Sequence, residues 1–357
     1  MSLSPPIPYS DDLEYRREDE TATIAELCET FDTILETTAK DYGKAVRSVH
    51  AKAHGVLEGK LTILDDLPPE LAQGLFAAPG EHDVVLRIST NPGDIVDDAI
   101  SLPRGLAMKV MDVAGERLPD AEGTTQDFVM VNAPTFQMKN AERFLANLKM
   151  LAATTDRAEG AKVALSNVLR PLQAALDTVG LASPKIGAMG GTPNTDPLGE
   201  TYYSATPFRY GEYVAKFGLF PVSQDLLARR GEKIDASEDE NAIRHTIREE
   251  MRAIEGHWEF RVQLCRDLDK HPIEDPMTEW DEAASPFVTV ARLTVAPQDS
   301  WDEERVRLVN EQLRFSIWTG LAAHRPLGNI NRARNAPYAH SARYRERYNG
   351  CPIHEPG

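Results

Sequence analysis

The C-terminal part of the sequence places a tyrosine between arginines at helical spacing. Residues 334–345 read R-N-A-P-Y-A-H-S-A-R-Y-R, so in a helix Arg334, Tyr338 and Arg345 project from one side. Nearby guanidinium groups favour the phenolate form of a tyrosine, because positive charge stabilises an ionised oxygen. A phenolate suits ferric iron, tyrosine is one of the known proximal ligands of haem, and the same arginines can bind carboxylates. Taken alone, one Arg-x-x-x-Tyr is more often a tyrosine packed on the core beside solvated arginines.

A second group of polar residues lies upstream. The segment A-V-R-S-V-H-A-K-A-H-G contains Arg47 and His50, and L-R-I-S-T contains Arg87 and Ser89. A lone histidine at the start of a strand is usually a hydrogen-bonded core residue. Neutral imidazole is also the ordinary proton shuttle for peroxide, taking a proton from one oxygen and passing it to the leaving one. We expect Ser89 to hydrogen-bond the other ring nitrogen and so fix the tautomer of the histidine.

The composition limits the classes of function. The chain of 357 residues is 41% hydrophobic and 27% charged, the balance of a soluble globular protein. Its formal net charge of −17 repels phosphate backbones, so nucleic acid is not an expected partner. The three cysteines are far apart and indicate neither a disulfide framework nor a zinc site. No apolar stretch approaches the roughly 20 residues of a membrane span, and the acidic N-terminal segment lacks a secretory signal, which predicts a cytoplasmic protein.

The elements that must position these residues are strands at both ends of a helical middle. Residues 1–22 indicate an extended arm on a surface or on a partner subunit. Because strands follow one another without β-α alternation, the fold class is α+β, an antiparallel sheet or barrel that carries helices. Apolar alternation predicts strands over 56–64, 83–90, 105–113, 127–134, 208–220, 257–266 and 286–296. Helices are predicted over about 23–41, 140–155, 161–180, 302–316 and 335–348, with a loop over 186–200.

Seven motifs, taken in their order along the chain, resemble those of the haem catalase family. R-S-V-H-A-K-A-H-G is similar to the family's distal-histidine motif, R-I-S-T to its serine segment, and P-R-G-L-A-M-K to its P-R-G-x-A-x-K. D-F-V-M-V-N-A-P-T-F resembles D-L-V-G-N-N-T-P-x-F, Y-V-A-K-F resembles Y-V-K-F, and E-Q-L-R-F resembles E-Q-x-x-F. Residues 334–345 match R-x-x-x-Y-x-x-x-x-R-x-R, and the resemblance spans about residues 45–348.

The resemblance implies an antiparallel eight-stranded β-barrel with surrounding helices and a bound haem b. It divides the chain into an N-terminal arm and helix, residues 1–44, and a catalase-like haem-binding core without an added C-terminal domain, residues 45–357. It also implies a homo-oligomer. The site residues that it implies are Tyr338 as iron ligand, Arg334 as support of its phenolate, His50 and Ser89 as the distal pair, Arg47, Arg87 and Arg345 on the propionates, and Phe144 beside the haem on the distal side.

Three features depart from the family, which are position 131, Ala53 where the family has glycine, and a few extra residues around 116–126. Val131 stands where the family has the asparagine that hydrogen-bonds peroxide, and a valine side chain has no donor or acceptor. Asn132 could replace it only if the backbone shifted by one residue, because successive side chains of a strand point to opposite faces. Loss of one preorganised donor commonly costs on the order of 10²–10³ in rate, so fast disproportionation of hydrogen peroxide is not expected.

The sequence therefore predicts a haem-dependent oxidoreductase that processes peroxide, a catalase-related peroxidase with weak true catalase activity. Its partners would be a peroxide or organic hydroperoxide and a reducing co-substrate. Two alternatives stay open. One is an enzyme that converts an organic or lipid hydroperoxide, as catalase-like allene oxide synthases do, because Val131 makes the pocket more apolar. The other is a haem-binding protein without catalytic activity.

Overall fold

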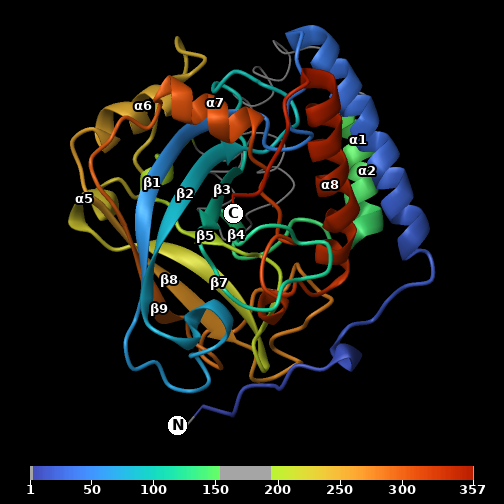
Figure 1. Cartoon of the computed structure of the whole chain (residues 1–357), viewed down its shortest axis with the longest axis vertical. Helices are drawn as coiled ribbons and strands as arrows, with labels where there is room; N and C mark the ends of the chain where they lie inside the picture. Colours follow the sequence, from blue (N-terminus) through green and yellow to red (C-terminus); the bar gives the residue numbers. More distant parts are fainter. Residues whose placement is uncertain (1–2, 153–193, 357) are drawn as a thin grey trace, which may run out of the picture.

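The computed structural model describes residues 3–152 and 194–356 (Figure 1). The helix predicted over 161–180 and most of the loop predicted over 186–200 lie outside the described residues. Within the described part, an antiparallel barrel forms one half of the molecule, and a layer of helices covers one side of it.

The barrel is a ring of eight antiparallel strands. The order β5-β4-β3-β2-β1-β9-β8-β7 is closed because β5 also pairs with β7, while β6 lies outside the ring as a hairpin on β7. This confirms the α+β fold and the eight-stranded barrel. The strands are β1 Ala53–Ile63, β2 Gly80–Thr90, β3 Arg104–Val110, β4 Gln126–Val131, β5 Tyr202–Tyr203, β6 Phe208–Tyr210, β7 Tyr213–Pro221, β8 Gly256–Leu264 and β9 Val288–Val295.

Alternation along β2 decides which side chains reach the outside of the barrel. Val84, Leu86 and Ile88 belong to the main core cluster, so Arg87 and Ser89, between and after them, lie on the opposite face. The register continues this arrangement across the neighbouring strands, since Arg87 pairs with Ala107, which pairs with Val129. In the same way, Ser89 pairs with Gly105, which pairs with Val131. The outer face of β2, β3 and β4 therefore carries polar groups and small or apolar side chains in two rows.

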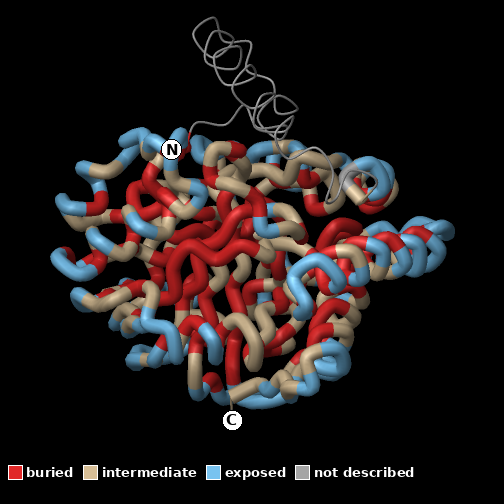
Figure 2. The backbone as a smooth tube through the Cα atoms, turned by 90° about the horizontal axis from the view of Figure 1, so that it is seen from above, coloured by how far each residue is buried: buried red, intermediate tan, exposed pale blue. Residues whose placement is uncertain are grey.

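Three helices form the layer beside this face: α1 Glu20–Tyr42, α2 Ala141–Ala152 and α8 Asn329–Asn349. Their shared core holds Leu27, Phe31 and Ile34 of α1 at helical spacing, together with Leu145 and Leu148 of α2. Figure 2 shows that the layer turns a mainly exposed surface outward. The other helices are α5 Gln224–Ala228, α6 Ala242–Met251 and α7 Glu303–Glu311, with 3-10 turns at Asp11–Leu13, Gly74–Ala77, Pro197–Gly199 and Ala322–His324.

The described part of the N-terminal arm lies on its own chain. The amide of Ile7 donates to the carbonyl of Cys265, at 2.8 Å. Farther along, the buried guanidinium of Arg332 on α8 contacts Glu14 at 2.6 Å and Glu20 at 2.7 Å. The arm and α1 thus anchor the N-terminal half of α8. The division of the chain at residue 44 and the homo-oligomer stay predictions.

The boundaries of several elements differ from those predicted. The single strand expected over 208–220 is a hairpin, because Gly211 adopts a left-handed φ of 61° and turns the chain between β6 and β7. The helix expected over 302–316 ends at Glu311, and α8 begins at Asn329, earlier than expected. The sequence did not predict α5 or α6.

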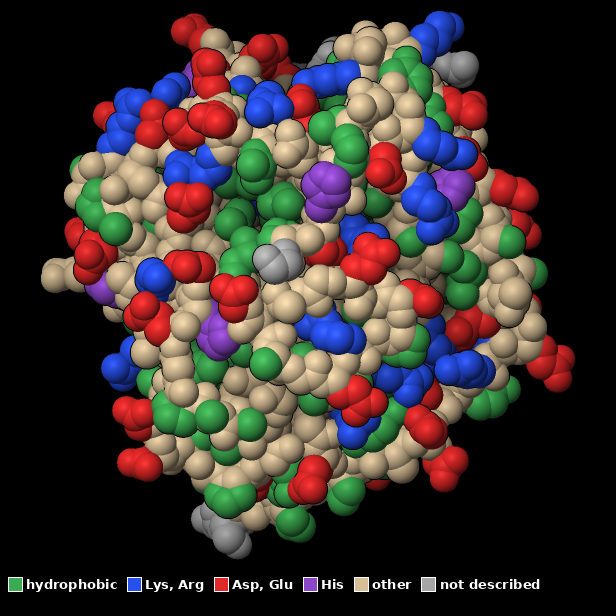
Figure 3. All heavy atoms as spheres, viewed as in Figure 1, with side chains coloured by type: hydrophobic (Ala, Val, Ile, Leu, Met, Phe, Trp, Pro, Cys, Tyr) green, Lys and Arg blue, Asp and Glu red, His purple; other side chains and the backbone are tan. Residues whose placement is uncertain are grey.

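Charged side chains of both signs are spread over the surface (Figure 3). On the face drawn in Figure 3, acidic and basic side chains are interspersed without a continuous basic stripe. None of the helices among the described residues combines the length and the apolar character that crossing a bilayer requires.

Candidate functional site

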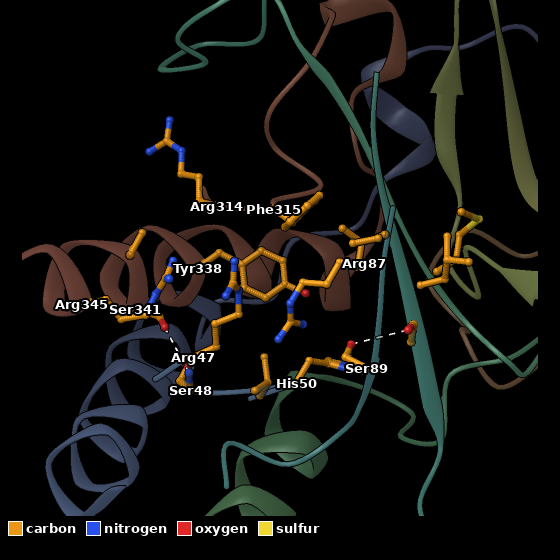
Figure 4. Close-up of a pocket in the computed structure, with 17 residues that line it drawn as sticks. Arg47, Ser48, His50, Arg87, Ser89, Arg314, Phe315, Tyr338, Ser341 and Arg345 are labelled. Carbon is orange, nitrogen blue, oxygen red and sulfur yellow. Dashed lines mark hydrogen bonds between the residues drawn. The ribbon is translucent and has the colours of Figure 1, made fainter. Parts of the chain in front are cut away.

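A cavity lies between the outer face of β2–β4 and helix α8. About 610 Å³ of space not filled by atoms lies in it, including its open mouth. Figure 4 shows α8 with Tyr338 along one side and the segment with Ser48 and His50 along another. The lining includes six of the predicted site residues, which are Arg47, His50, Arg87, Ser89, Tyr338 and Arg345.

Tyr338 reaches the cavity from the middle of α8 and is held by Arg334, one turn earlier. The Nε and Nη2 atoms of Arg334 donate to the tyrosine oxygen at 3.0 Å and 2.5 Å. A guanidinium has only donors, so the oxygen accepts both hydrogen bonds. Two hydrogen bonds from a charged donor fix the position of the tyrosine oxygen at the edge of the cavity.

His50 lies in the segment before β1 with a left-handed φ of 53°, not at the start of the strand as expected. Its Nδ1 atom is 3.2 Å from Ser89 Oγ, so the predicted contact is confirmed. Ser89 Oγ also lies 3.5 Å from the carbonyl oxygen of Gly105, which can only accept. We therefore assign the serine proton to that carbonyl and a proton to Nδ1, which leaves Nε2 as the unprotonated nitrogen. Desolvation, with the charges of Arg87 and Arg334, lowers the pKa of His50 from 6.5 to about 3.

Gly105 packs directly against the imidazole ring of His50. A Cβ atom added at this position would lie 2.5 Å from Cε1 of His50, closer than atoms in contact can be. The histidine is therefore placed by the absence of a side chain at position 105 as well as by Ser89.

We expect Gly105→Ala to displace the imidazole and to reduce peroxide turnover by about 10–100-fold, the range typical for loss of a supporting contact. Ligand binding elsewhere in the cavity should stay close to that of the parent protein. Steady-state peroxide consumption measures the first effect and absorbance titration with haem the second. A variant with parent activity would show that the histidine position is not fixed by this glycine.

Three arginines converge at one edge of the cavity. Arg87 is 2% exposed and Arg345 is 3% exposed, while Arg47 is partly buried. Among the described residues, none of the three forms an ion pair with a carboxylate, and Arg345 Nε has no hydrogen-bond partner. Burial, with the neighbouring charge of Arg345, lowers the pKa of Arg87 to about 9, and burial lowers that of Arg345 to about 10. Within the described residues, the three guanidiniums donate to neutral acceptors, which leave their positive charge uncompensated. This is the arrangement expected for binding an external anion.

The other arginines near the end of the chain behave differently. Arg325 and Arg332 are paired with carboxylates of the arm, at 2.9 Å to Glu14 and 2.7 Å to Glu20 respectively. Arg325 and Arg332 therefore belong to a structural ion-pair network with the arm, whereas Arg345 lines the cavity.

Val131 lies in the row of the sheet that contains Gly105 and Ser89. The neighbouring Asn132 cannot take its place, because its amide oxygen accepts from the backbone N–H of Arg104 at 2.9 Å. Its own N–H donates to the carbonyl of the same residue at 3.2 Å, which continues the β3–β4 ladder. The donor missing at position 131 is thus not supplied by the next residue.

Phe144 is not part of the cavity wall. It lies on α2, packs against the cluster that holds Leu27 and Phe31, and contacts Phe136 edge-on, with ring centroids 5.8 Å apart. Val49, which does line the cavity, packs against the same cluster. Phe144 therefore packs behind a residue of the cavity wall, and its place beside the haem stays a prediction.

Several lining residues were not predicted. Arg314 and Phe315 belong to the E-Q-L-R-F motif, which was recognised without a role. Ser341 accepts from the backbone N–H of Ser48 at 3.2 Å and so ties α8 to the histidine segment. Nothing in the sequence pattern distinguishes this serine from others on the surface of a helix.

No family model matches the sequence, and no curated protein sequence is similar to it at a significant level. Solved structures of catalases are similar in fold. A fungal catalase covers 89% of this chain at a TM-score of 0.59 and 17% identity, and a bacterial catalase covers 90% at 0.58 and 19%. Catalase A from Saccharomyces cerevisiae covers 90% at a TM-score of 0.58 and 16% identity. The chain spans between 62% and 66% of the length of these proteins. At this level of identity the comparisons show the fold, and the fold is that of the catalases.

Proposed function

We propose that this chain is a haem-dependent oxidoreductase that processes peroxide, with catalase-related peroxidase activity and weak true catalase activity. One observation carries the proposal. A tyrosine oxygen held by two arginine hydrogen bonds shares a cavity with a neutral histidine and with three arginines that lack carboxylate partners. A catalase fold around this cavity adds support at the level of architecture.

The residues present fit a haem b. Tyr338 is the candidate iron ligand, because its oxygen borders the cavity and accepts two hydrogen bonds from the cationic guanidinium of Arg334. Arg47, Arg87 and Arg345 are the candidates for the propionates, and the unpartnered Nε of Arg345 is a donor without an acceptor. When bound, a ferric haem supplies the electrons that break the O–O bond and stores the oxidising equivalents.

The protein's own part in the reaction is proton transfer. Nε2 of His50 accepts the proton of one peroxide oxygen and returns it to the other oxygen, which leaves as water or as an alcohol. Ser89 holds the ring through Nδ1 at 3.2 Å, so that Nε2 stays the basic atom. A reducing co-substrate then supplies two electrons and two protons in total, so that the second peroxide oxygen leaves as water and the protein returns to its resting state.

The low pKa of His50 predicts an unusual pH dependence. The base form is present above its pKa of about 3 and is lost only as the pH falls through that value, so kcat/KM for peroxide should show no inflection near 6.5. The test is peroxide consumption across a range from about pH 4 to about pH 9, with the folded state checked by circular dichroism at each point. An acid limb centred near 6.5 would mean that the histidine is solvated or does not act as the base.

Val131 predicts a gain-of-function variant. Val131→Asn puts a donor into the row of Ser89 and Gly105, and we expect it to raise oxygen release from hydrogen peroxide by on the order of 10². The matched control is Val288→Asn, an exposed valine on β9. If oxygen release rises in neither variant, position 131 does not contact the substrate.

The apolar side chains around the distal part of the cavity favour one second candidate. Ala107 and Val129 line the cavity and Val131 is adjacent, an environment that suits an organic hydroperoxide better than hydrogen peroxide. The activity would be conversion of a lipid hydroperoxide, of the allene-oxide-synthase type.

Turnover of hydrogen peroxide and of a fatty-acid hydroperoxide by the haem-loaded protein tests both candidates. Oxidation of an added phenolic donor with either peroxide supports the peroxidase. Product formation from the lipid hydroperoxide without any donor supports the second candidate. Haem binding without consumption of either peroxide would contradict both and indicate a haem-binding protein without catalytic activity.

A further inference from the structure

The last turn of α7 brings the three arginines of the cavity together. Arg47 donates to the backbone carbonyls of Val309, Asn310 and Leu313, each at 2.9 Å. Arg345 donates to the carbonyls of Asn310 at 2.8 Å and Leu313 at 3.3 Å. Carbonyls at a helix C-terminus lack intrahelical partners and carry partial negative charge, so this turn attracts guanidinium groups.

The side chain of Asn310 adds the third arginine to this group. Its Oδ1 atom accepts from Arg87 Nε at 3.0 Å and lies 3.5 Å from Arg47 Nη1. One residue thus contacts all three guanidiniums, two through its backbone carbonyl and two through its side-chain oxygen. The arginines come from three distant segments, so their mutual position depends on this shared acceptor.

The side-chain oxygen of Asn310 belongs to a neutral amide, so it does not offset the positive charge of the three arginines. Three like charges in one buried cluster repel each other, and the pKa of Arg47 is lowered by burial and by the charges of Arg345 and Arg87. A carboxylate at position 310 would relieve the repulsion from within the protein. An amide oxygen supplies a hydrogen bond of similar geometry and leaves the positive charge uncompensated.

We infer that Asn310 is a positioning residue that gathers Arg47, Arg87 and Arg345 and keeps their charge available for the carboxylates of the ligand. The inference rests on the proposed haem function and adds a determinant of ligand selectivity to it. The amide orients the guanidiniums, and its neutrality makes the edge of the cavity selective for a dicarboxylate over an uncharged ligand of the same shape.

The test compares two iron-free ligands, protoporphyrin IX and its dimethyl ester, by fluorescence titration of the full chain. Neither ligand uses Tyr338 as an iron ligand, and neither needs turnover. Because hydrogen bonds to charged groups are strong, we expect the parent protein to prefer the diacid by about 10–100-fold. Asn310→Asp keeps the shape and the acceptor and adds one negative charge, so it should remove most of this preference. Asn310→Ala removes the side-chain acceptor without adding charge and should lower the preference less.

The matched control is Asn335→Asp, which makes the same change of charge at an exposed position of α8. It should keep the preference of the parent protein. A general structural defect would weaken both ligands alike and leave the ratio of their dissociation constants unchanged, so an unchanged ratio in Asn310→Asp overturns the inference. Equal binding of diacid and ester by the parent protein also overturns it, while the porphyrin site remains. Binding of neither ligand overturns the inference together with the proposed function.

Discussion

Replacing Tyr338 by phenylalanine is expected to abolish stable haem binding and to reduce peroxide turnover by more than about 100-fold, because loss of a direct ligand costs more than loss of a residue that supports one. Phenylalanine keeps the ring and its packing and removes only the oxygen. That oxygen accepts two hydrogen bonds from Arg334, at 3.0 Å and 2.5 Å, and no other oxygen of α8 in the described chain makes both contacts. The readouts are the absorbance of the haem adduct and the rate of peroxide loss.

Tyr344→Phe is the matched control for this variant. Tyr344 is on the same helix but stacks on Tyr348, with ring centroids 5.9 Å apart, and does not line the cavity. The Tyr344→Phe protein should bind haem and consume peroxide like the parent protein. If Tyr338→Phe retained both the haem spectrum and the activity, the iron would have another ligand and the assignment of this tyrosine would be wrong.

Replacing His50 by asparagine is expected to lower kcat/KM for peroxide by about 10²–10⁴, the usual contribution of a general acid-base group. Asparagine is chosen because residue 50 has a φ of 53°, a left-handed conformation that asparagine tolerates better than most residues. The amide cannot accept and return a proton at neutral pH. Haem affinity should change little, since the ring contacts Ser89 and not the proposed ligand or the arginines.

This pattern separates proton transfer from cofactor binding. His245→Asn, at an exposed position of α6, is the control and should leave both quantities unchanged. A His50→Asn protein that binds haem normally and turns over peroxide at the parent rate would remove the histidine from the mechanism. Loss of haem together with activity would instead show that His50 has a role in forming the cavity.

The barrel strands could be predicted because apolar and polar residues alternate along part of several of them. In β2, Val84, Leu86 and Ile88 enter the core, and Arg87 and Ser89 take the other face, as period-two patterning requires. Closure of the barrel could not be predicted from the alternation of apolar and polar residues. It depends on the two-residue strand Tyr202–Tyr203, which is too short to produce a periodic signal.

The candidate site was predictable where spacing along one element decides it. The contact of Arg334 with Tyr338 follows from helical periodicity, and the contact of Ser89 with His50 follows from the motifs that were recognised. The conformation of His50 was not predictable, because a left-handed φ in a histidine depends on tertiary contacts such as the close approach of Gly105.

Which arginines remain available for a ligand could not be predicted from the sequence either. Arg332 and Arg345 lie on the same helix, yet the first pairs with Glu20, more than 300 residues away. Within the part of the chain that the structure describes, the second donates only to neutral carbonyls. The difference arises from the docking of the arm and of α7 against α8. The same holds for Asn310, whose importance comes from three distant arginines and not from any local pattern.

The central claim is that this chain binds a haem through Tyr338, and titration of the purified protein with ferric haem b tests it most directly. Absorbance and electron paramagnetic resonance spectra should show saturation at one haem per chain and a high-spin ferric iron without histidine ligation. A titration without saturable binding, or a low-spin adduct with nitrogen ligands, would contradict the tyrosine ligation and the function built on it.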